Sequence, residues 1–172
     1  MTQLPDKFKL QVAQLLGQEE ADGLCRALLE EPTVSVRVNR AKAGCPPQDV
    51  ENERVPWCET GYYLSSRPSF TLDPLFHAGT YYVQEASSMF IEQAFKTMDF
   101  QPQRMLDLCA APGGKSTLWR SLLPDGALLV ANEPIRQRAM ILLENLTKWG
   151  HPDVVVTNAY PEIGRASCRE RV

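Results

Sequence analysis

Long apolar runs are missing from this sequence of 172 residues. No stretch of about eighteen apolar residues occurs, which is what a membrane-spanning helix would need. The amino terminus carries charged residues early and lacks an apolar segment, so we expect no signal peptide. The five cysteines form no Cys-x-x-Cys pair and are odd in number, which favours reduced thiols over a zinc site or a disulfide framework. We therefore expect a cytoplasmic protein with no metal and no membrane partner.

The sequence also lacks a strong excess of charge, because its formal net charge is only −3. Residues 1–100 hold nine Lys and Arg against fourteen Asp and Glu, whereas residues 101–172 hold nine against seven. A nucleic-acid-binding domain is usually clearly basic, so composition alone does not suggest RNA. Two local basic clusters remain as candidates, Arg37 with Arg40 and Lys42, and Arg136 with Arg138.

The most informative segment is RMLDLCAAPGGKS, residues 104–116. It predicts a short strand over 104–108, a loop of small residues over 109–114, and a helix over 115–123. Gly113 and Gly114 would let the backbone approach a ligand, and the free N–H groups of the helix start would face it. An ordinary strand-to-helix turn is the alternative, but two glycines, a proline and four small residues in succession disfavour it. The segment therefore predicts a nucleotide-type pocket.

The residue types in this loop discriminate between nucleotides. A phosphate-binding P-loop needs a glycine where Cys109 stands, and Pro112 removes an N–H group that would hold phosphates. The dinucleotide fingerprint Gly-x-Gly-x-x-Gly is not matched either. S-adenosylmethionine remains. Glu133 supports it, because it follows a second apolar run about twenty residues after the loop, where an acidic residue binds ribose hydroxyls; a solvated surface glutamate is the alternative.

Hydrophobic periodicity predicts the surrounding elements. The second part of the chain alternates strands and helices, which predicts a parallel sheet with right-handed crossovers. Its expected elements are 104–108, 115–123, 127–132, 134–149 with Pro134 in the first helical turn, and 153–157. The first part predicts two helices within 4–30, a half-buried strand over 33–38, short strands and turns over 43–75 including 61–64, a strand over 80–83, and one helix over 85–97. Trp57, Tyr62, Tyr63, Tyr81 and Tyr82 are candidates for stacking on RNA bases, although most aromatics at such positions lie in a core.

Three segments carry a resemblance to a known family. DLCAAPGGKST, followed by ANEP and a helix containing ENLTKWG, resembles the Sun-family (Nop/Sun) RNA cytosine carbon-5 methyltransferases. HAGTYYVQEASSM (77–89) and TVSVRVN (33–39) are similar to two further signatures of that family, in the same order. The resemblance is strongest to the bacterial ribosomal-RNA type. It implies a Rossmann-like class I α/β methyltransferase domain preceded by a small α+β RNA-binding domain, with S-adenosylmethionine as cofactor and ribosomal RNA, rather than transfer RNA, as partner.

The resemblance also implies domain limits. We expect an RNA-positioning domain over 1–97 and the first three strands of the methyltransferase domain over 98–162. The family pattern stops after Glu162, so we expect residues 163–172 to be a non-native or aberrant tail on an amino-terminal fragment; an ordinary basic terminus is the alternative. Strand 104–108 would then form an open edge of the sheet.

The same resemblance implies the site. The expected cofactor-binding residues are Cys109, Ala110, Ala111, Pro112, Gly113, Gly114 and Lys115 around the methionine and ribose, Glu133 on the ribose hydroxyls, Arg138 in support, and Asn158 near the adenine. The family's catalysis needs a cysteine thiolate that adds to cytosine carbon 6, and neither family cysteine motif occurs in this sequence. No catalytic residue is therefore assigned. Two other functions stay open: a non-catalytic RNA- or ribosome-binding module with a vestigial cofactor loop, and, disfavoured, a P-loop nucleotide hydrolase.

Overall fold

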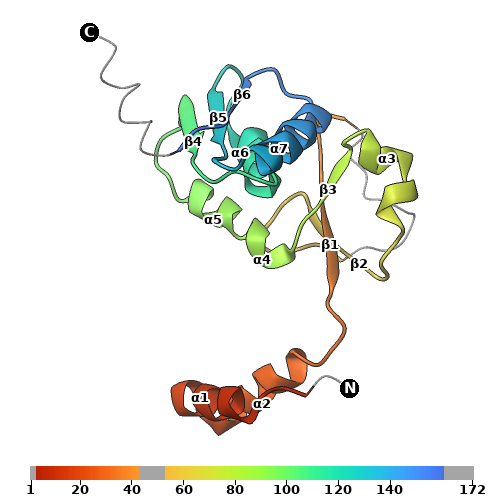
Figure 1. Cartoon of the computed structure of the whole chain (residues 1–172), viewed down its shortest axis with the longest axis vertical. Coiled ribbons are helices and arrows are strands. Elements are labelled where there is room, and N and C mark those ends of the chain that lie inside the picture. The colour runs from red at the N-terminus through yellow and green to blue at the C-terminus, as the bar shows by residue number, and fades with distance from the viewer. Residues whose placement is uncertain (1–2, 43–52, 161–172) are drawn as a thin grey trace. The chain divides into compact units, whose positions relative to one another are not determined.

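The computed structural model of the chain describes residues 3–42 and 53–160, which form two compact units (Figure 1). The units are Met1–Thr33 and Val34–Val172, each with its own set of internal contacts. The second unit contains residues from both sides of the expected domain limit at 97, which stays a prediction. The expected tail, 163–172, lies outside the described residues.

The first unit is a pair of helices, as the periodicity of residues 4–30 predicted. Helix α1 (Asp6–Leu16) and helix α2 (Gln18–Ala27) meet at Gly17, whose φ of 86° lies in the region that glycine adopts most readily. Only Val12 and Ala21 are buried within these helices, while Leu15 is 82% exposed. The unit therefore has a small core of its own.

The second unit begins with a three-stranded antiparallel sheet of order β2-β1-β3. Its strands are β1 (Val34–Val38), β2 (Gly61–Leu64) and β3 (Tyr81–Val83), all within predicted strand segments. A 3₁₀ turn, η1 (Phe70–Leu72), and a short helix, α3 (Pro74–His77), were not predicted. They cover one face of the sheet through a core of Val36, Phe70 and Tyr81. Tyr81 is 2% exposed and donates a hydrogen bond to Asp73, so it is a core residue in this structure.

The prediction that β1 is half-buried was wrong. Its polar side chains are as deeply buried as Val36 and Val38, with Ser35 4% and Arg37 0% exposed, and Asn39, directly after the strand, is 2% exposed. Alternation of polar and apolar residues predicts a polar face that meets water, but in this strand the polar face packs against other elements and is held by hydrogen bonds. Arg37 is therefore removed from the basic cluster proposed with Arg40 and Lys42.

The single helix expected over 85–97 is two short helices, α4 (Ala86–Met89) and α5 (Ile91–Lys96). The break falls at Phe90, where the backbone bonds connect residues three apart, from Phe90 N–H to Ser87 O and from Gln93 N–H to Phe90 O. Such bonds tighten the chain into a 3₁₀-type turn. Ala86 and Met89 of α4 belong to a core cluster with Val55 and Cys58.

The parallel sheet expected in the second part is confirmed, with strand order β4-β5-β6. The strands are β4 (Arg104–Asp107), β5 (Leu128–Asn132) and β6 (Val154–Thr157), and the connecting helices are α6 (Gly114–Leu122) and α7 (Arg136–Trp149). Helix α7 begins two residues later than predicted, because Pro134 lies outside it and Ile135 is its N-cap.

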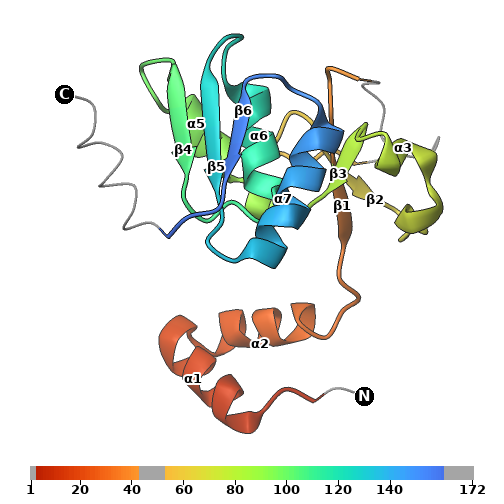
Figure 2. The same cartoon turned by 45° about the horizontal axis from the view of Figure 1, so that its top comes forward.

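One face of this sheet is covered by helices (Figure 2). Leu129 of β5 packs with Phe95 of α5 and Trp119 of α6, and Ala131 packs with Leu142 and Leu146 of α7. The other face is open within the described residues, where Leu106 is 57% and Val155 45% exposed. Strand β4 lies at the edge of this sheet, as the sequence predicted, since only β5 pairs with it among the described strands.

Candidate cofactor site

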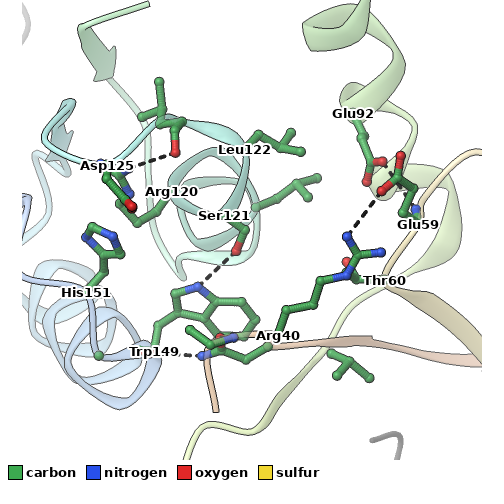
Figure 3. Close-up of a pocket in the computed structure, with 16 residues that line it drawn as sticks. Arg40, Glu59, Thr60, Glu92, Arg120, Ser121, Leu122, Asp125, Trp149 and His151 are labelled. Atoms are coloured by element: carbon green, nitrogen blue, oxygen red, sulfur yellow. Dashed lines mark hydrogen bonds and ion pairs between the residues drawn. The ribbon is translucent and has the colours of Figure 1, made fainter. Parts of the chain in front are cut away.

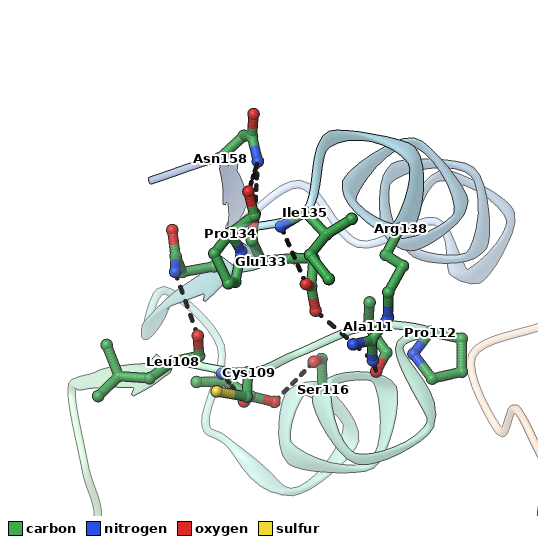
Figure 4. Close-up of polar contacts among 12 residues, drawn as sticks. Leu108, Cys109, Ala111, Pro112, Ser116, Glu133, Pro134, Ile135, Arg138 and Asn158 are labelled. Atoms are coloured by element: carbon green, nitrogen blue, oxygen red, sulfur yellow. Dashed lines mark hydrogen bonds and ion pairs between the residues drawn. The ribbon is translucent and has the colours of Figure 1, made fainter. Parts of the chain in front are cut away.

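Strands β4, β5 and β6 are parallel, so their carboxyl ends lie on the same side of the sheet, which we call its carboxyl edge. Ligands bind at this edge in open α/β folds. Asp107, at the end of β4, connects Cys109 of the first loop with Ser116 of α6, two residues that Figure 4 labels. Its Oδ1 accepts the Cys109 N–H at 3.3 Å and its Oδ2 accepts the Ser116 hydroxyl at 2.8 Å. The carboxylate therefore holds together the beginning of the small-residue loop and the first turn of α6.

The loop reaches α6 through Gly113, which has a φ of 113° and is the N-cap of the helix. A side chain at this φ would be strained, so the turn requires glycine. The preceding Ala111–Pro112 peptide bond is cis. The carbonyl of Pro112 accepts hydrogen bonds from the Asn145 amide at 2.7 Å and from the Tyr82 hydroxyl at 3.4 Å. The loop is thus supported by α7 on one side and by β3 on the other.

Glu133 follows β5 directly and is 1% exposed. Its Oε1 accepts the Ile135 N–H at 3.1 Å, and its Oε2 lies 3.7 Å from the guanidinium of Arg138. Arg138 also donates to the carbonyl of Ala111 at 3.0 Å (Figure 4). This half-exposed arginine therefore links the loop to the carboxylate.

Two asparagines form further hydrogen bonds at the carboxyl edge of the sheet. Asn132 donates to Leu108 O at 3.1 Å and to Ala159 O at 2.9 Å, and its Oδ1 accepts the Thr157 hydroxyl at 2.9 Å. This one side chain ties together the ends of all three strands. The Asn158 amide donates to the carbonyls of Glu133, at 2.6 Å, and Pro134, at 3.0 Å.

The structure gathers nearly all the sequence-predicted residues in one connected region. Loop 109–114, Glu133, Arg138 and Asn158 are joined by the contacts above, while Lys115 lies in the first turn of α6. Asn158, expected near an adenine, uses its amide N–H groups on the backbone after β5. Sequence reasoning missed Asp107 and Asn132 as organisers, although both stand at the end of a predicted strand beside the site, which is the signal that could have identified them.

A separate pocket lies away from this edge (Figure 3). It has a volume of about 260 Å³ and is lined by the end of β1, the second half of α6 and the end of α7, but by none of the predicted cofactor residues. Its walls carry charges of both signs. Arg40 pairs with Glu59 at 3.3 Å, and the Trp149 indole donates to the Ser121 hydroxyl at 3.2 Å.

Metal-binding and membrane-spanning features are both absent from the described ranges, 3–42 and 53–160. Within these ranges, no three or more His, Cys, Asp or Glu side chains cluster in a way that could hold a metal ion. No helix in the same part of the chain is both long and apolar enough to cross a membrane.

A parallel sheet with a glycine loop before its first crossover helix and an acidic residue after its second strand is the arrangement of a Rossmann-like nucleotide-binding domain. Two family models match the chain: the N-terminal domain of 16S rRNA methyltransferase RsmF over residues 4–86, and 16S rRNA methyltransferase RsmB/F over residues 97–163. The chain belongs to this RsmB/F branch of the Sun family.

Individual relatives agree with this assignment. The chain is 34% identical over 176 residues to ribosomal RNA small subunit methyltransferase F of Aeromonas hydrophila, covering 91% of this chain and 36% of that protein. The protein of the same name from Shewanella sp. (strain ANA-3) is 33% identical over 168 residues, covering 92% of this chain and 35% of its own length. The chain thus spans about a third of the length of these curated relatives.

Solved structures match the same architecture. A methyltransferase homolog protein from Pyrococcus horikoshii is 26% identical with a TM-score of 0.74, and the match covers 95% of this chain and 60% of that one. NSun6 from Pyrococcus horikoshii is 16% identical with a TM-score of 0.72, covering 93% and 67% of the two chains, which shows a shared fold only.

Proposed function

We propose that this chain is the part of a ribosomal RNA cytosine carbon-5 methyltransferase that binds S-adenosylmethionine. The observation that carries the proposal is the connection of the glycine loop to Glu133 through Arg138, at the carboxyl edge of a parallel sheet. Arg138 joins the loop and the carboxylate, which are distant in sequence, by a hydrogen bond to the Ala111 carbonyl and an ion pair with Glu133.

The chemistry of the donor set fits a nucleoside that has no phosphate. Pro112 has no N–H to offer a phosphate, and the residue after β5 is a carboxylate, which accepts hydrogen bonds from a ribose diol. One carboxylate oxygen of Glu133, Oε2, has its nearest cation 3.7 Å away and so retains capacity as an acceptor. When bound, S-adenosylmethionine supplies an activated methyl group. The residues of this chain hold and orient the donor: Glu133 through the ribose, and Cys109–Lys115 through their backbone.

Ribosomal RNA of the small subunit is the partner we propose, supported by the names of the relatives and by the family models. Cytosine carbon 5 as the methylated atom rests on the family resemblance. A thiolate is needed for that chemistry. The pKa of the buried Cys58 thiol is raised, first by burial, which makes it a poor nucleophile, and Cys109 lies in the cofactor loop. We assign no catalytic residue and expect no methyl transfer by this chain alone.

The test is a calorimetric titration of the chain with S-adenosylmethionine, S-adenosylhomocysteine and, separately, ATP with magnesium. The expected result is weak binding of both adenosyl compounds and no binding of ATP. Magnesium-dependent ATP binding would instead support a P-loop hydrolase and overturn the proposal. Incubation with labelled donor and small-subunit ribosomal RNA should transfer no methyl group, and a covalent complex with 5-fluorocytosine RNA would reveal a catalytic thiol that we do not assign.

A non-catalytic RNA- or ribosome-binding module is the second candidate. The observation that favours it is the burial of Glu133, which is 1% exposed and has Arg138 3.7 Å from its Oε2. On this alternative the chain would retard ribosomal RNA in a gel and would bind neither adenosyl compound. Binding of S-adenosylhomocysteine that competes with S-adenosylmethionine excludes it.

A further inference from the structure

Arg37 lies on β1, far from the glycine loop in sequence, yet its side chain ends at the start of α6. The guanidinium donates to the Gly114 carbonyl at 3.2 Å and to the Thr117 hydroxyl, and its Nε donates to the Gln84 side chain at 2.9 Å. Its Cζ lies 4.5 Å from the centre of the Trp149 ring, and its Nη1 has no hydrogen-bond partner among the described residues. Gly114 and Thr117 belong to the first turn of the helix that the cofactor loop opens.

This arginine is unusual in that these acceptors are all neutral. It is 0% exposed, and burial lowers its pKa to about 10, which leaves the side chain charged at neutral pH. Taking a charge out of water is costly unless its donors are well placed. A planar guanidinium can satisfy several acceptors at fixed angles, which an ammonium cannot. We therefore interpret the buried charge of Arg37 by what it orients: its guanidinium holds the carbonyl of Gly114 and the hydroxyl of Thr117 in fixed positions.

The polar residue that directly follows β1 holds a different element. Asn39 donates to the carbonyl of Trp149, at the end of α7, at 2.9 Å, and to that of Gly79 at 3.1 Å. Gly79 has no room for a side chain, because a Cβ would lie 2.0 Å from the Lys148 carbonyl. Arg37 thus holds the start of α6 by hydrogen bonds and contacts the end of α7 only through the ring of Trp149, whereas Asn39 holds the end of α7 by a hydrogen bond to its backbone. The hydrogen bonds of the two residues can therefore be tested separately, at the amides of α6 and at the Gly150 amide.

We propose that Arg37 is a positioning residue for the cofactor loop. It fixes the first turn of α6, and with it the N-terminal backbone groups of the helix, from the antiparallel sheet. Tyr82 and Gln84 of the same sheet region complete this support, since a Cβ on Gly114 would lie 3.4 Å from Tyr82 and 3.6 Å from Gln84. The consequence for cofactor affinity rests on the proposed function, but the local effect on α6 does not.

The test is amide hydrogen exchange on the full chain, which reports local opening. Arg37→Met removes the hydrogen bonds and keeps an unbranched apolar stem. It should speed exchange of the Thr117 and Leu118 amides by about tenfold or more, while the Gly150 amide at the end of α7 changes little. Asn39→Ala is the matched control. It should speed exchange of the Gly150 amide and leave exchange of the Thr117 and Leu118 amides unchanged. Equal acceleration at both places in either variant would mean general destabilisation and would overturn the proposal.

Thr117→Val serves if Arg37→Met does not fold. It keeps the side-chain volume and removes one acceptor of Arg37, so Leu118 exchange should increase in the same direction by a smaller factor, with Gly150 unchanged. No increase in that variant would also overturn the proposal.

Cofactor binding gives the second readout. If the wild-type chain binds S-adenosylhomocysteine, Arg37→Met should weaken binding about tenfold or more and Asn39→Ala less than about twofold. If the wild-type chain binds no adenosyl compound, the proposed function fails while the exchange result still decides the role of Arg37. Equal weakening by both variants would refute a specific role.

Discussion

Replacing Glu133 by glutamine tests the carboxylate that the cofactor proposal depends on. The change keeps the side-chain shape and removes one charge. In the structure, Glu133 accepts the Ile135 N–H and lies 3.7 Å from Arg138. An amide oxygen can keep the bond to Ile135, so the local fold has a way to persist, whereas a ribose diol loses its charged acceptor.

The two effects differ in size. A hydrogen bond to a charged group contributes about 1.5–3 kcal/mol, so affinity for S-adenosylhomocysteine should fall roughly 10- to 150-fold. Folding should change by less. Interaction of an anion with a helix start is worth about 0.3–1 kcal/mol, and the contact to the half-exposed Arg138 must be discounted for solvent screening. We expect the free energy of unfolding to fall by no more than about 1 kcal/mol.

Calorimetric titration and urea unfolding of the same preparations measure both quantities. Glu144→Gln is the matched control, because it removes one negative charge from an exposed position on α7, where Glu144 pairs with Lys148. The control should bind as the wild type does. Unchanged affinity in Glu133→Gln, or an equal loss in the control, would refute the ribose role.

Three further predictions use other parts of the molecule. Asn132→Ala removes the side chain that joins three strand ends and should lower the free energy of unfolding by about 2–4 kcal/mol in urea; a loss below about 1 kcal/mol would contradict this. Burial, then the charge of a nearby arginine, lowers the pKa of His151 from 6.5, so the folded state binds fewer protons than the unfolded state and stability should fall as pH drops below 6.5. In melts at several pH values, His151→Gln should remove this dependence of stability on pH, whereas His77→Gln should keep it. The same pH dependence in His151→Gln and in the wild type would refute the role of His151. The open sheet face should cause self-association, which Leu106→Lys and Val155→Lys reduce in sedimentation; a monomeric wild type would show that the face does not drive association.

The sequence predicted best where local chemistry decides the structure. The loop before α6 could be located because Gly113 must adopt a positive φ, and the strands on either side of it because their apolar runs are short and bounded by turns. Glu133 and the loop could be assigned to one place, because parallel strands bring their carboxyl ends to the same side of the sheet. Arg138, on α7, was placed there only by the family resemblance.

The errors come from tertiary contacts that local pattern does not encode. Ser35, Arg37 and Asn39 alternate with valines as solvent-facing residues would, yet they bond to carbonyls and side chains distant in sequence. Met89, just before the break at Phe90, enters a core that is assembled from residues earlier in the chain. No periodicity in a single segment contains that information.

The most direct test of the central claim is the amide spectrum of the isotope-labelled chain during titration with S-adenosylmethionine. We predict shifts at loop 109–115 and at Glu133, with the pocket residues Ser121 and Trp149 unchanged. An absence of shifts at saturating cofactor, or shifts confined to that pocket, would contradict the claim that this edge of the sheet binds the cofactor.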